Sequence, residues 1–255
     1  MLSNGNQRVA LVTGGARGIG AAIARGLAQD GLSVVIADVL TKEAGEMAEA
    51  INRSGGTAVA IALDVTDSAS VEVGVGKARE RFGQIDVLVN NAGWDQLKLF
   101  VDTDEAFWEQ ILDVNFKGGL RMTRAILPEM IQRRWGRVVN ISSDAARVGS
   151  SLESVYAGAK AAVIAFTKTV AREAARSGVT ANVVCPGPTD TPLLREVAAG
   201  RAGGDIVLER MAKSVPMKRI AQPEDVAVAV RFFATEGAGY ITGQTLSVSG
   251  GLTMA

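Results

Sequence analysis

Short runs of apolar residues alternate along the chain with longer stretches in which apolar positions recur every three or four residues. Runs such as Val34-Val35-Ile36 and Val87-Leu88-Val89 are apolar without interruption, which is typical of strands in a sheet covered on both faces. The pattern predicts strands at residues 8–13, 33–38, 57–63, 85–90, 137–142, 180–185 and 245–248. It predicts helices at residues 18–30, 42–53, 68–81, 105–133 and 155–176, and Pro128 is expected to bend the fourth.

This regular alternation of strand and helix is typical of an α/β fold with a parallel sheet. We expect a single Rossmann-type, doubly wound sheet of about seven strands with helices on both faces. No linker or repeat divides the sequence, so residues 1–255 are expected to form one domain. Residues 186–222 interrupt the pattern with prolines and glycines, and a short helix is expected at 206–213. A long insertion of this kind is typical of a lid or binding loop, so we expect it to contact substrate or cofactor.

Composition and charge exclude several classes of function. The 27 basic and 27 acidic residues balance, which gives no support for binding to nucleic acid or to a membrane surface. The chain has no histidine, which excludes Ser-His-Asp hydrolysis and histidine-ligated metals, and no carboxylate cluster argues for another metal site. The single cysteine, Cys185, cannot form an internal disulfide and is expected to pack as a small apolar residue. Without a signal peptide or a membrane-spanning run in the sequence, a cytoplasmic location is expected.

A glycine-rich turn connects the first predicted strand to the first predicted helix. Gly14, Gly18 and Gly20 allow close approach of the backbone to a pyrophosphate, and the helix offers free N–H groups and the positive end of its dipole. The same glycines also fit an ordinary strand-to-helix turn. Asp38 ends the second predicted strand, where it can bind both adenosine ribose hydroxyls and repel a 2′-phosphate, which favours NAD over NADP. Arg17 is a weaker signal for NADP, because a basic residue in this turn can meet a 2′-phosphate.

Tyr156 and Lys160 are one helical turn apart in the predicted helix 155–176, and Ser143 follows the fifth predicted strand. A free tyrosine has a pKa of about 10 and is a poor acid or base at neutral pH. A lysine at i+4 lies on the same helix face, so its charge is expected to lower the pKa of the tyrosine. Each residue alone also fits a structural role, as a core tyrosine, a solvated lysine or a turn-capping serine. Beside a nucleotide-binding turn, the three favour a proton-transfer site.

Together these motifs resemble those of the short-chain dehydrogenase/reductase family over nearly the whole chain. They follow the family's order: Thr13-Gly14-x-x-x-Gly18-x-Gly20, Asp64-Val65, Asn90-Asn91-Ala92-Gly93, the set Asn115, Ser143, Tyr156 and Lys160, then Pro186-Gly187 and Thr189. The resemblance implies a nicotinamide cofactor bound by Gly14, Arg17, Gly18, Ile19, Gly20, Asp38, Asp64, Val65, Asn91, Ala92, Gly93, Tyr156, Lys160, Pro186, Gly187, Thr189 and Thr191.

The resemblance also implies roles for a catalytic set of Asn115, Ser143, Tyr156 and Lys160. Tyr156 exchanges a proton with the oxygen of a secondary alcohol or ketone while hydride passes to or from nicotinamide, and Ser143 holds the same oxygen. Lys160 additionally binds the nicotinamide ribose, and Asn115 holds a water molecule that links Lys160 to solvent.

Segments 91–95, 143–151, 185–191 and 247–254 more closely resemble 2-hydroxycyclohexanecarboxyl-CoA dehydrogenases, and the chain is more generally similar to 3-oxoacyl-carrier-protein reductases. These resemblances imply a cyclic or β-hydroxyacyl thioester as the substrate, carried on coenzyme A or a carrier protein. The candidate substrate contacts, which flank the catalytic positions and equally fit packing or solvation, are Trp94, Asp95, Asp144, Arg147 and Ser150. Candidates for the phosphates of coenzyme A are Arg147, Lys213, Lys218 and Arg219.

Other classes remain open at this point. A dehydrogenase of free cyclic or aromatic secondary alcohols needs the same catalytic residues. Epimerases and dehydratases with bound NAD share the scaffold, but they usually carry a larger sugar-nucleotide domain. A redox sensor that binds NAD without turnover would be expected to lose Tyr156 or Lys160, and both are present. Apolar residues cover more than one stripe of the predicted helix 155–176, and the family resemblance implies a homodimer or homotetramer.

Overall fold

The computed structural model describes residues 7–199 and 204–254, in which a seven-stranded sheet has the order β3-β2-β1-β4-β5-β6-β7. Every strand pairing in this sheet is parallel. This confirms the predicted doubly wound α/β fold, and each predicted strand is present within two residues of its expected bounds. The strands are β1 (Val9–Thr13), β2 (Ser33–Asp38), β3 (Thr57–Ala62), β4 (Val87–Asn90), β5 (Gly136–Ile141), β6 (Val179–Pro186) and β7 (Thr245–Val248).

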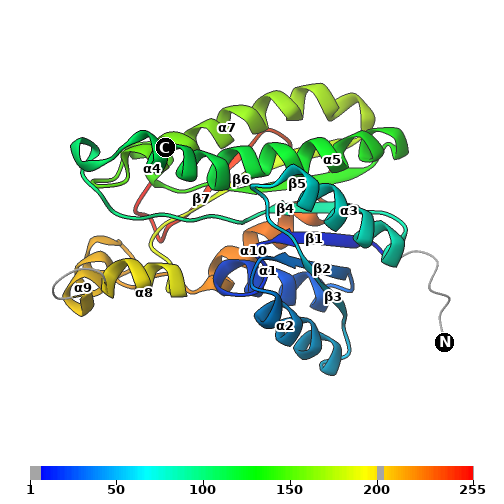
Figure 1. The fold of residues 1–255 in the computed structure, drawn as a ribbon, viewed down its shortest axis with the longest axis horizontal. Coiled ribbons are helices and arrows are strands. Elements are labelled where there is room, and N and C mark those ends of the chain that lie inside the picture. Colours follow the sequence, from blue (N-terminus) through cyan, green and yellow to red (C-terminus); the bar gives the residue numbers. More distant parts are fainter. Residues whose placement is uncertain (1–6, 200–203, 255) are drawn as a thin grey trace.

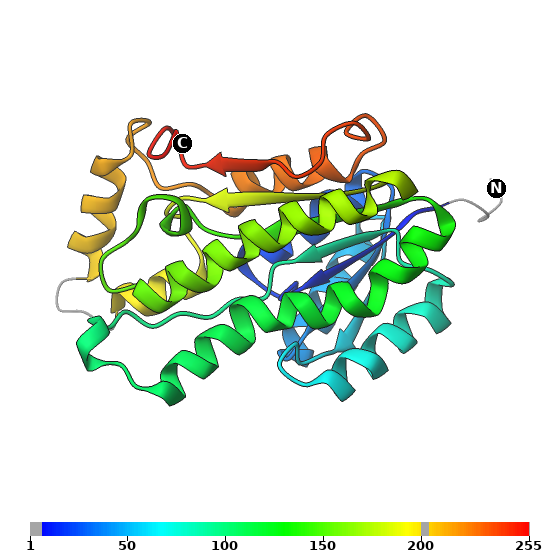
Figure 2. The same cartoon turned by 90° about the horizontal axis from the view of Figure 1, so that it is seen from above.

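Helices cover both faces of the sheet (Figures 1 and 2). One face carries α1 (Gly18–Gln29), α2 (Thr41–Arg53) and α10 (Pro223–Ala234), and the other carries α3 (Ser68–Phe82), α5 (Gly118–Arg133) and α7 (Ser154–Ala174). Neighbouring residues of a strand point to opposite faces, so Ala10 and Val12 pack into one apolar cluster and Leu11 into the other. The uninterrupted apolar runs of the strands are explained by this double coverage.

The predicted helix 105–133 is divided, and the division lies well before Pro128. It consists of α4 (Glu105–Leu112), a π-helical turn η2 (Asp113–Lys117) and α5, which continues past Pro128 to Arg133. The buried Asn115 is in the π-helical turn, and its amide nitrogen donates hydrogen bonds to Ile111 O (3.0 Å) and Trp94 O (2.7 Å). A side chain that bonds into the helical ladder locally widens it, which accounts for the irregular turn.

One large helix, α10, was not predicted from the sequence pattern. It begins with Pro223 in its first turn and a capping box between Gln222 and Asp225, and it buries Val226, Val230 and Phe233. Proline and a reciprocal cap directly before apolar residues at helical spacing are a start signal that could have identified it. It packs against α1, and Arg231 forms an ion pair with Asp30.

The insertion between β6 and α10 contains α8 (Pro192–Ala199) and α9 (Gly204–Ser214), and the predicted short helix 206–213 is part of α9. Residues 200–203 of this insertion, like the polar start of the sequence at residues 1–6, are outside the described ranges. Figure 1 shows α8 and α9 projecting beyond the carboxyl ends of the strands. Shorter elements are η1 (Phe100–Asp102), α6 (Ala145–Val148) and η3 (Ala175–Ser177). None of the helices described is both long enough and apolar enough to cross a membrane.

Candidate active site

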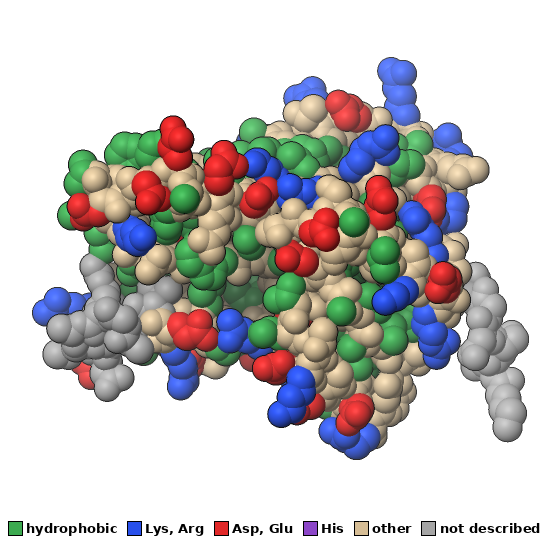
Figure 3. All heavy atoms as spheres, in the orientation of Figure 1, with side chains coloured by type: hydrophobic (Ala, Val, Ile, Leu, Met, Phe, Trp, Pro, Cys, Tyr) green, Lys and Arg blue, Asp and Glu red, His purple; other side chains and the backbone are tan. Residues whose placement is uncertain are grey.

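A cleft of about 380 Å³ opens where β1, β4, β5 and β6 end. One wall contains Gly14 and Gly18 after β1, and the opposite wall contains Ser143, Tyr156 and Lys160. Figure 3 shows a hollow in this part of the surface, with hydrophobic side chains around it. Ligands of open α/β sheets bind at the carboxyl ends of the strands, at the point where the chain changes from one face to the other. Here that point is between β1 and β4, which are neighbours in the sheet.

The glycine-rich turn is shaped so that larger residues do not fit. Gly14 and Gly18 adopt positive φ angles of 61° and 55°. A Cβ on Gly14 would lie 2.9 Å from Ala92 Cα, and a Cβ on Gly20 would lie 2.0 Å from Gly14 O. Arg17, at the N-cap of α1, makes no side-chain capping bond, so the first N–H groups of the helix keep their capacity for a ligand. The turn therefore fits the pyrophosphate of a dinucleotide.

Polar side chains fix the ends of the central strands. Thr13 Oγ1 accepts hydrogen bonds from the backbone N–H groups of Asn91 (3.0 Å) and Ala92 (3.1 Å). The amide nitrogen of Asn91 donates to Thr13 O and Gly14 O, both at 3.0 Å. A second amide, Asn90, donates to Asn140 Oδ1 (2.8 Å) on the neighbouring strand. These bonds hold the glycine-rich turn and the connection after β4 in a fixed relation.

Asp38 ends β2 and is buried beside the glycine-rich turn. Its Oδ2 accepts a hydrogen bond from Ala16 N (2.9 Å), and its Oδ1 accepts one from Leu40 N (3.0 Å). Each oxygen keeps a lone pair, so the fixed carboxylate can still accept bonds from ribose hydroxyls. Arg17 is exposed and forms an ion pair with Glu196 of α8 (3.0 Å).

Asp64 and Val65 follow β3 and are also held in place. Asp64 Oδ1 accepts hydrogen bonds from the backbone N–H (2.8 Å) and the hydroxyl (2.7 Å) of Thr66. Val65 is buried, and its carbonyl accepts a bond from Arg121 (3.2 Å). Neither residue lines the main cleft, whereas Ile19, Asn91, Ala92 and Gly93 do.

Tyr156, Ser143 and Lys160 lie together at the end of β5 and the start of α7. Both Tyr156 and Ser143 line the cleft, and hydrogen bonding with Ser143 lowers the pKa of Tyr156. Lys160 is buried; its Nζ donates to Ile141 O (3.1 Å) and lies 5.7 Å from the centre of the Tyr156 ring. Ser142 Oγ in turn donates to Lys160 O (2.8 Å), which fastens α7 to the end of β5.

The electrostatics of this group differ from the expectation that Lys160 lowers the pKa of Tyr156. Burial raises the pKa of Tyr156, the carboxylates of Asp95 and Glu153 raise it further, and only the hydrogen bond with Ser143 acts significantly in the other direction. Burial also lowers the pKa of Lys160 from 10.5 to about 8. That expectation is therefore wrong for the polypeptide by itself, because the lysine is directed at a carbonyl and desolvation outweighs its charge. In this state the tyrosine is a proton donor.

Behind Lys160 is a second, small cavity of about 20 Å³ that is also lined by Asn115, Asn90 and Asn140. A polar cavity of this size accommodates one water molecule. The side chain of Asn115 is directed at the backbone, because its Oδ1 accepts a bond from Trp94 N (3.2 Å) while its nitrogen donates to two carbonyls.

The insertion at residues 186–222 contributes the outer wall. Pro186, Gly187, Thr189 and Thr191 line the cleft where β6 ends. Thr189 is buried, and a Cβ on Gly187 would lie 2.9 Å from Ser249 Cβ. Apolar side chains complete the wall. Leu193, Leu194 and Met211 come from the insertion that was predicted to contact substrate or cofactor, whereas Val148 and Leu252 were not singled out from the sequence.

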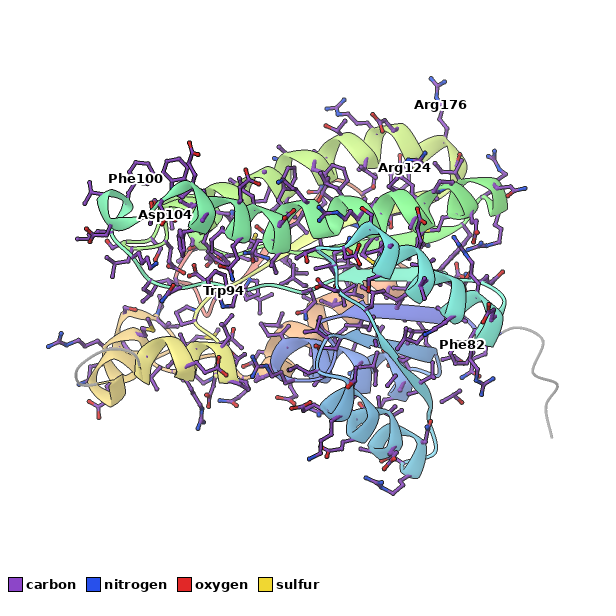
Figure 4. The ribbon with its side chains drawn as sticks, viewed as in Figure 1. Phe82, Trp94, Phe100, Asp104, Arg124 and Arg176 are labelled. Carbon is purple, nitrogen blue, oxygen red and sulfur yellow. The ribbon has the colours of Figure 1, made fainter. Side chains whose placement is uncertain are left out.

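The candidate substrate residues are divided between the cleft and its surroundings. Asp144 and Ser150 line the cleft, although Asp144 Oδ1 accepts a bond from Ser247 Oγ (2.6 Å). Arg147 donates to the same hydroxyl (2.7 Å) and is not among the lining residues. Trp94 lies on the connection between β4 and η1 (Figure 4), where its ring packs against Phe107 at 6.1 Å.

The basic residues considered for coenzyme A are engaged within the protein. Lys213 pairs with Glu209 (3.6 Å), Lys218 donates to Lys213 O (2.9 Å), and Arg219 forms an ion pair with Asp225 (2.5 Å). Within residues 7–199 and 204–254, no group of three or more Cys, Asp or Glu side chains is arranged to hold a metal ion. Cys185 is buried, and burial raises the pKa of its thiol to about 11, as expected for a packing residue.

Comparison with known proteins identifies the class. A family model described as enoyl-(acyl carrier protein) reductase matches residues 14–253. The chain belongs to the short-chain dehydrogenase/reductase family, whose members are oxidoreductases that use nicotinamide cofactors.

Several relatives are named as reductases. The chain is 41% identical over 247 residues to the short-chain reductase protein NovJ of Streptomyces niveus, covering 96% of this chain and 94% of that one. It is 38% identical over 248 residues to the 3-oxoacyl-[acyl-carrier-protein] reductase FabG of Escherichia coli, covering 97% and 98%. A crystal structure of an actinorhodin polyketide ketoreductase with NADPH superposes with a TM-score of 0.92 at 34% identity, covering 96% and 97%.

Proposed function

We propose that the protein interconverts a secondary alcohol and a ketone, with Tyr156 as the general acid and base. The observation that carries this proposal is the shared cleft, in which the Tyr156–Ser143–Lys160 group faces a glycine-rich turn suited to a dinucleotide. The names of the relatives, which include a ketoreductase and a 3-oxoacyl reductase, support the same reaction type.

A bound nicotinamide supplies hydride exchange at the reacting carbon. The residues of the chain manage the oxygen of that carbon. In reduction, the hydroxyl of Tyr156 gives its proton to the carbonyl oxygen; in oxidation, the phenolate takes the proton of the alcohol. Ser143 holds the oxygen through a second hydrogen bond. At neutral pH Tyr156 holds its proton in the protein without cofactor, which is the protonation state that reduction requires.

The proton lost from Tyr156 in reduction must be replaced. Lys160, with a pKa of about 8, can both give and receive a proton near neutral pH. It lies between Tyr156 and the small cavity that Asn115 also lines. We therefore assign Lys160 and Asn115 to a path by which a water molecule in that cavity returns a proton to the tyrosine.

NAD is the proposed cofactor. The buried carboxylate of Asp38 keeps free lone pairs beside the glycine-rich turn and would oppose the charge of a 2′-phosphate. Arg17, the residue that could attract that phosphate, is already paired with Glu196. The solved polyketide ketoreductase holds NADPH, so direct comparison of the two cofactors is part of the test below.

The proposed substrate is a cyclic or β-hydroxyacyl thioester of the 2-hydroxycyclohexanecarboxyl-CoA type. The apolar wall formed by Leu193, Leu194 and Met211 supports a ring or acyl chain. The name of the related 3-oxoacyl-[acyl-carrier-protein] reductase supports a carrier-protein thioester as the second candidate.

We further propose that the protein is a homodimer or homotetramer. Large apolar side chains are exposed on two separate parts of the surface. One part contains Phe100 and Val101 at the start of the α4 region, and the other contains Val228, Phe232 and Leu246. Exposed apolar groups that cluster on a surface are typical of contacts between subunits. Light scattering that finds a monomer at working concentration would exclude this assembly.

The test of the reaction is Tyr156→Phe, which keeps the ring and removes the exchangeable proton. A panel of cyclic ketones, hydroxyacyl-CoA esters and carrier-protein esters is followed through NADH and NADPH absorbance in both directions. We expect kcat/KM to fall by about 10²–10⁴ with unchanged cofactor affinity. Near-normal turnover by the variant would overturn the assignment of Tyr156.

A further inference from the structure

Two carboxyl groups meet at one side of the cleft. Asp95 is on the connection after β4, Glu153 immediately precedes α7, and both line the cleft. The two side chains are close enough for the charge of Glu153 to raise the pKa of Asp95. A backbone hydrogen bond from Lys98 N to Leu152 O (3.0 Å) holds the two chain segments together. The backbone therefore fixes the two carboxyl groups near each other.

One oxygen of this carboxyl pair lacks a donor within the described residues. Asp95 is only 8% exposed, and its Oδ1 receives no hydrogen bond from any donor in the described part of the chain. Glu153 is in the N-cap position of α7 but makes no capping bond with its side chain. The ammonium group of Lys98 lies over the ring of Phe107 at 4.7 Å. Two adjacent carboxylates need either a shared proton or a donor from outside, because a buried acceptor without a partner is unfavourable.

The pair is close to the reacting group. The charges of both carboxylates act on Tyr156, and the charge of Lys160 acts on Asp95. Burial, followed by the charge of Glu153, raises the pKa of Asp95 to about 7. Asp95 is therefore partly protonated near neutral pH.

This charge pattern selects the chemistry of a ligand. A carboxylate or phosphate at this position would be repelled by the pair. A positively charged ligand group would be repelled by the ammonium group of Lys160. A neutral hydroxyl group satisfies both conditions, because it donates a hydrogen bond to the pair without adding charge.

We propose that Asp95 and Glu153 form a substrate subsite that accepts a hydrogen bond from a hydroxyl group on the carbon next to the reacting one. The inference rests on the proposed alcohol–ketone reaction. It favours α-hydroxyketones and the corresponding vicinal diols as substrates over the thioesters proposed above. The substrate hydroxyl donates to Asp95 Oδ1, the oxygen that receives no hydrogen bond within the described residues.

The test compares 2-hydroxycyclohexanone with cyclohexanone, which differ only in this hydroxyl. The wild-type enzyme is expected to reduce the hydroxyketone with a kcat/KM about tenfold or more above that for cyclohexanone. Asp95→Asn and Glu153→Gln each replace one carboxyl group by an amide that donates a hydrogen bond to the other. The ratio of kcat/KM for 2-hydroxycyclohexanone to kcat/KM for cyclohexanone is therefore expected to fall to between about one and three. Cyclohexanone is the internal reference for fold and chemistry, and Glu80→Gln, an exposed carboxyl on α3, is the matched control.

Binding without turnover separates this inference from the proposed reaction. In the Tyr156→Phe protein with NADH, saturation-transfer NMR is expected to show preferential binding of 2-hydroxycyclohexanone, and addition of Asp95→Asn is expected to abolish the preference. This result stands even if neither ketone is reduced, in which case only the reaction is refuted. Equal binding of the two ketones, or an equal loss of turnover for both in Asp95→Asn, overturns the subsite.

Discussion

Asp38→Asn separates the charge of this residue from its hydrogen bonds. In the wild-type protein its two carboxylate oxygens accept bonds from Ala16 N (2.9 Å) and Leu40 N (3.0 Å). The asparagine retains one acceptor oxygen and loses the negative charge, so one of these N–H groups loses its partner. We therefore expect two effects of different origin, one on cofactor choice and one on stability.

The size of each effect follows from simple electrostatics. Two unit charges about 5 Å apart at an effective dielectric constant of about 20 interact by about 3 kcal/mol, which is about a hundredfold in relative affinity. The ratio of NADP to NAD affinity is therefore expected to rise by about two orders of magnitude in Asp38→Asn. The lost bond from a backbone N–H to a buried carboxylate is expected to lower the free energy of unfolding by about 1–3 kcal/mol.

Cofactor dissociation constants from fluorescence titration and urea unfolding of the same samples measure the two effects. Asp104→Asn is the matched control, because Asp104 also accepts a backbone bond, from Phe107 N (2.8 Å), but at the N-cap of α4 and outside the cleft lining. Asparagine is an equally good N-cap, so both readouts should stay unchanged there. A ratio of NADP to NAD affinity that does not change in Asp38→Asn would refute the role of Asp38 in cofactor choice.

Two further predictions concern the catalytic lysine and the glycine-rich turn. Burial lowers the pKa of Lys160 from 10.5 to about 8, so without cofactor the folded state carries an electrostatic cost below pH 8 that disappears as pH rises towards 10.5. Between pH 7 and pH 10 the unfolding free energy of the wild type should rise by about 2–3 kcal/mol relative to Lys160→Met in urea titrations, and parallel pH profiles would contradict this. Gly20→Ala places a Cβ 2.0 Å from Gly14 O, so cofactor affinity should fall by more than about tenfold and melting temperature should drop. Gly76→Ala in α3, where a Cβ meets no atom within 4 Å, should instead stabilise by about 0.5–1 kcal/mol without changing cofactor titrations; similar outcomes for the two variants would refute the steric argument.

Much of the fold could be predicted because its signals are local. Strands buried on both faces leave uninterrupted apolar runs, and the glycine-rich turn marks the first crossover. The sequence pattern did not predict α10, although Gln222, Pro223 and Asp225 form a clear start, because this helix follows the irregular segment 186–222 and not a strand. The break at Asp113–Lys117 had no comparable local signal, since Asn115 acts through contacts with Trp94, which is distant in the sequence.

The grouping of Ser143, Tyr156 and Lys160 in one cleft could be predicted from the sequence, but the electrostatics of this group could not. Spacing alone places Lys160 on the same helix face as Tyr156, but it does not reveal that Nζ is directed at Ile141 O. The sign of the pKa shift of Tyr156 depends on burial and on Asp95 and Glu153, which come from separate connections. Glu153 carries no sequence signal of its own, because its proximity to Asp95 arises only when the connection after β4 lies along the start of α7.

The outer wall of the cleft has a consequence for how such a protein can change. The Tyr156–Ser143–Lys160 group belongs to α7 and the end of β5, and the glycine-rich turn joins β1 to α1. The residues Leu193, Leu194 and Met211 come from an insertion after all of these elements. Selection or engineering can therefore vary the shape of the wall one residue at a time while the chemistry remains constant. We expect exchange of α8 and α9 among relatives to transfer substrate range. Because the wall and the reacting residues come from separate segments, new substrate ranges can evolve without loss of the reaction.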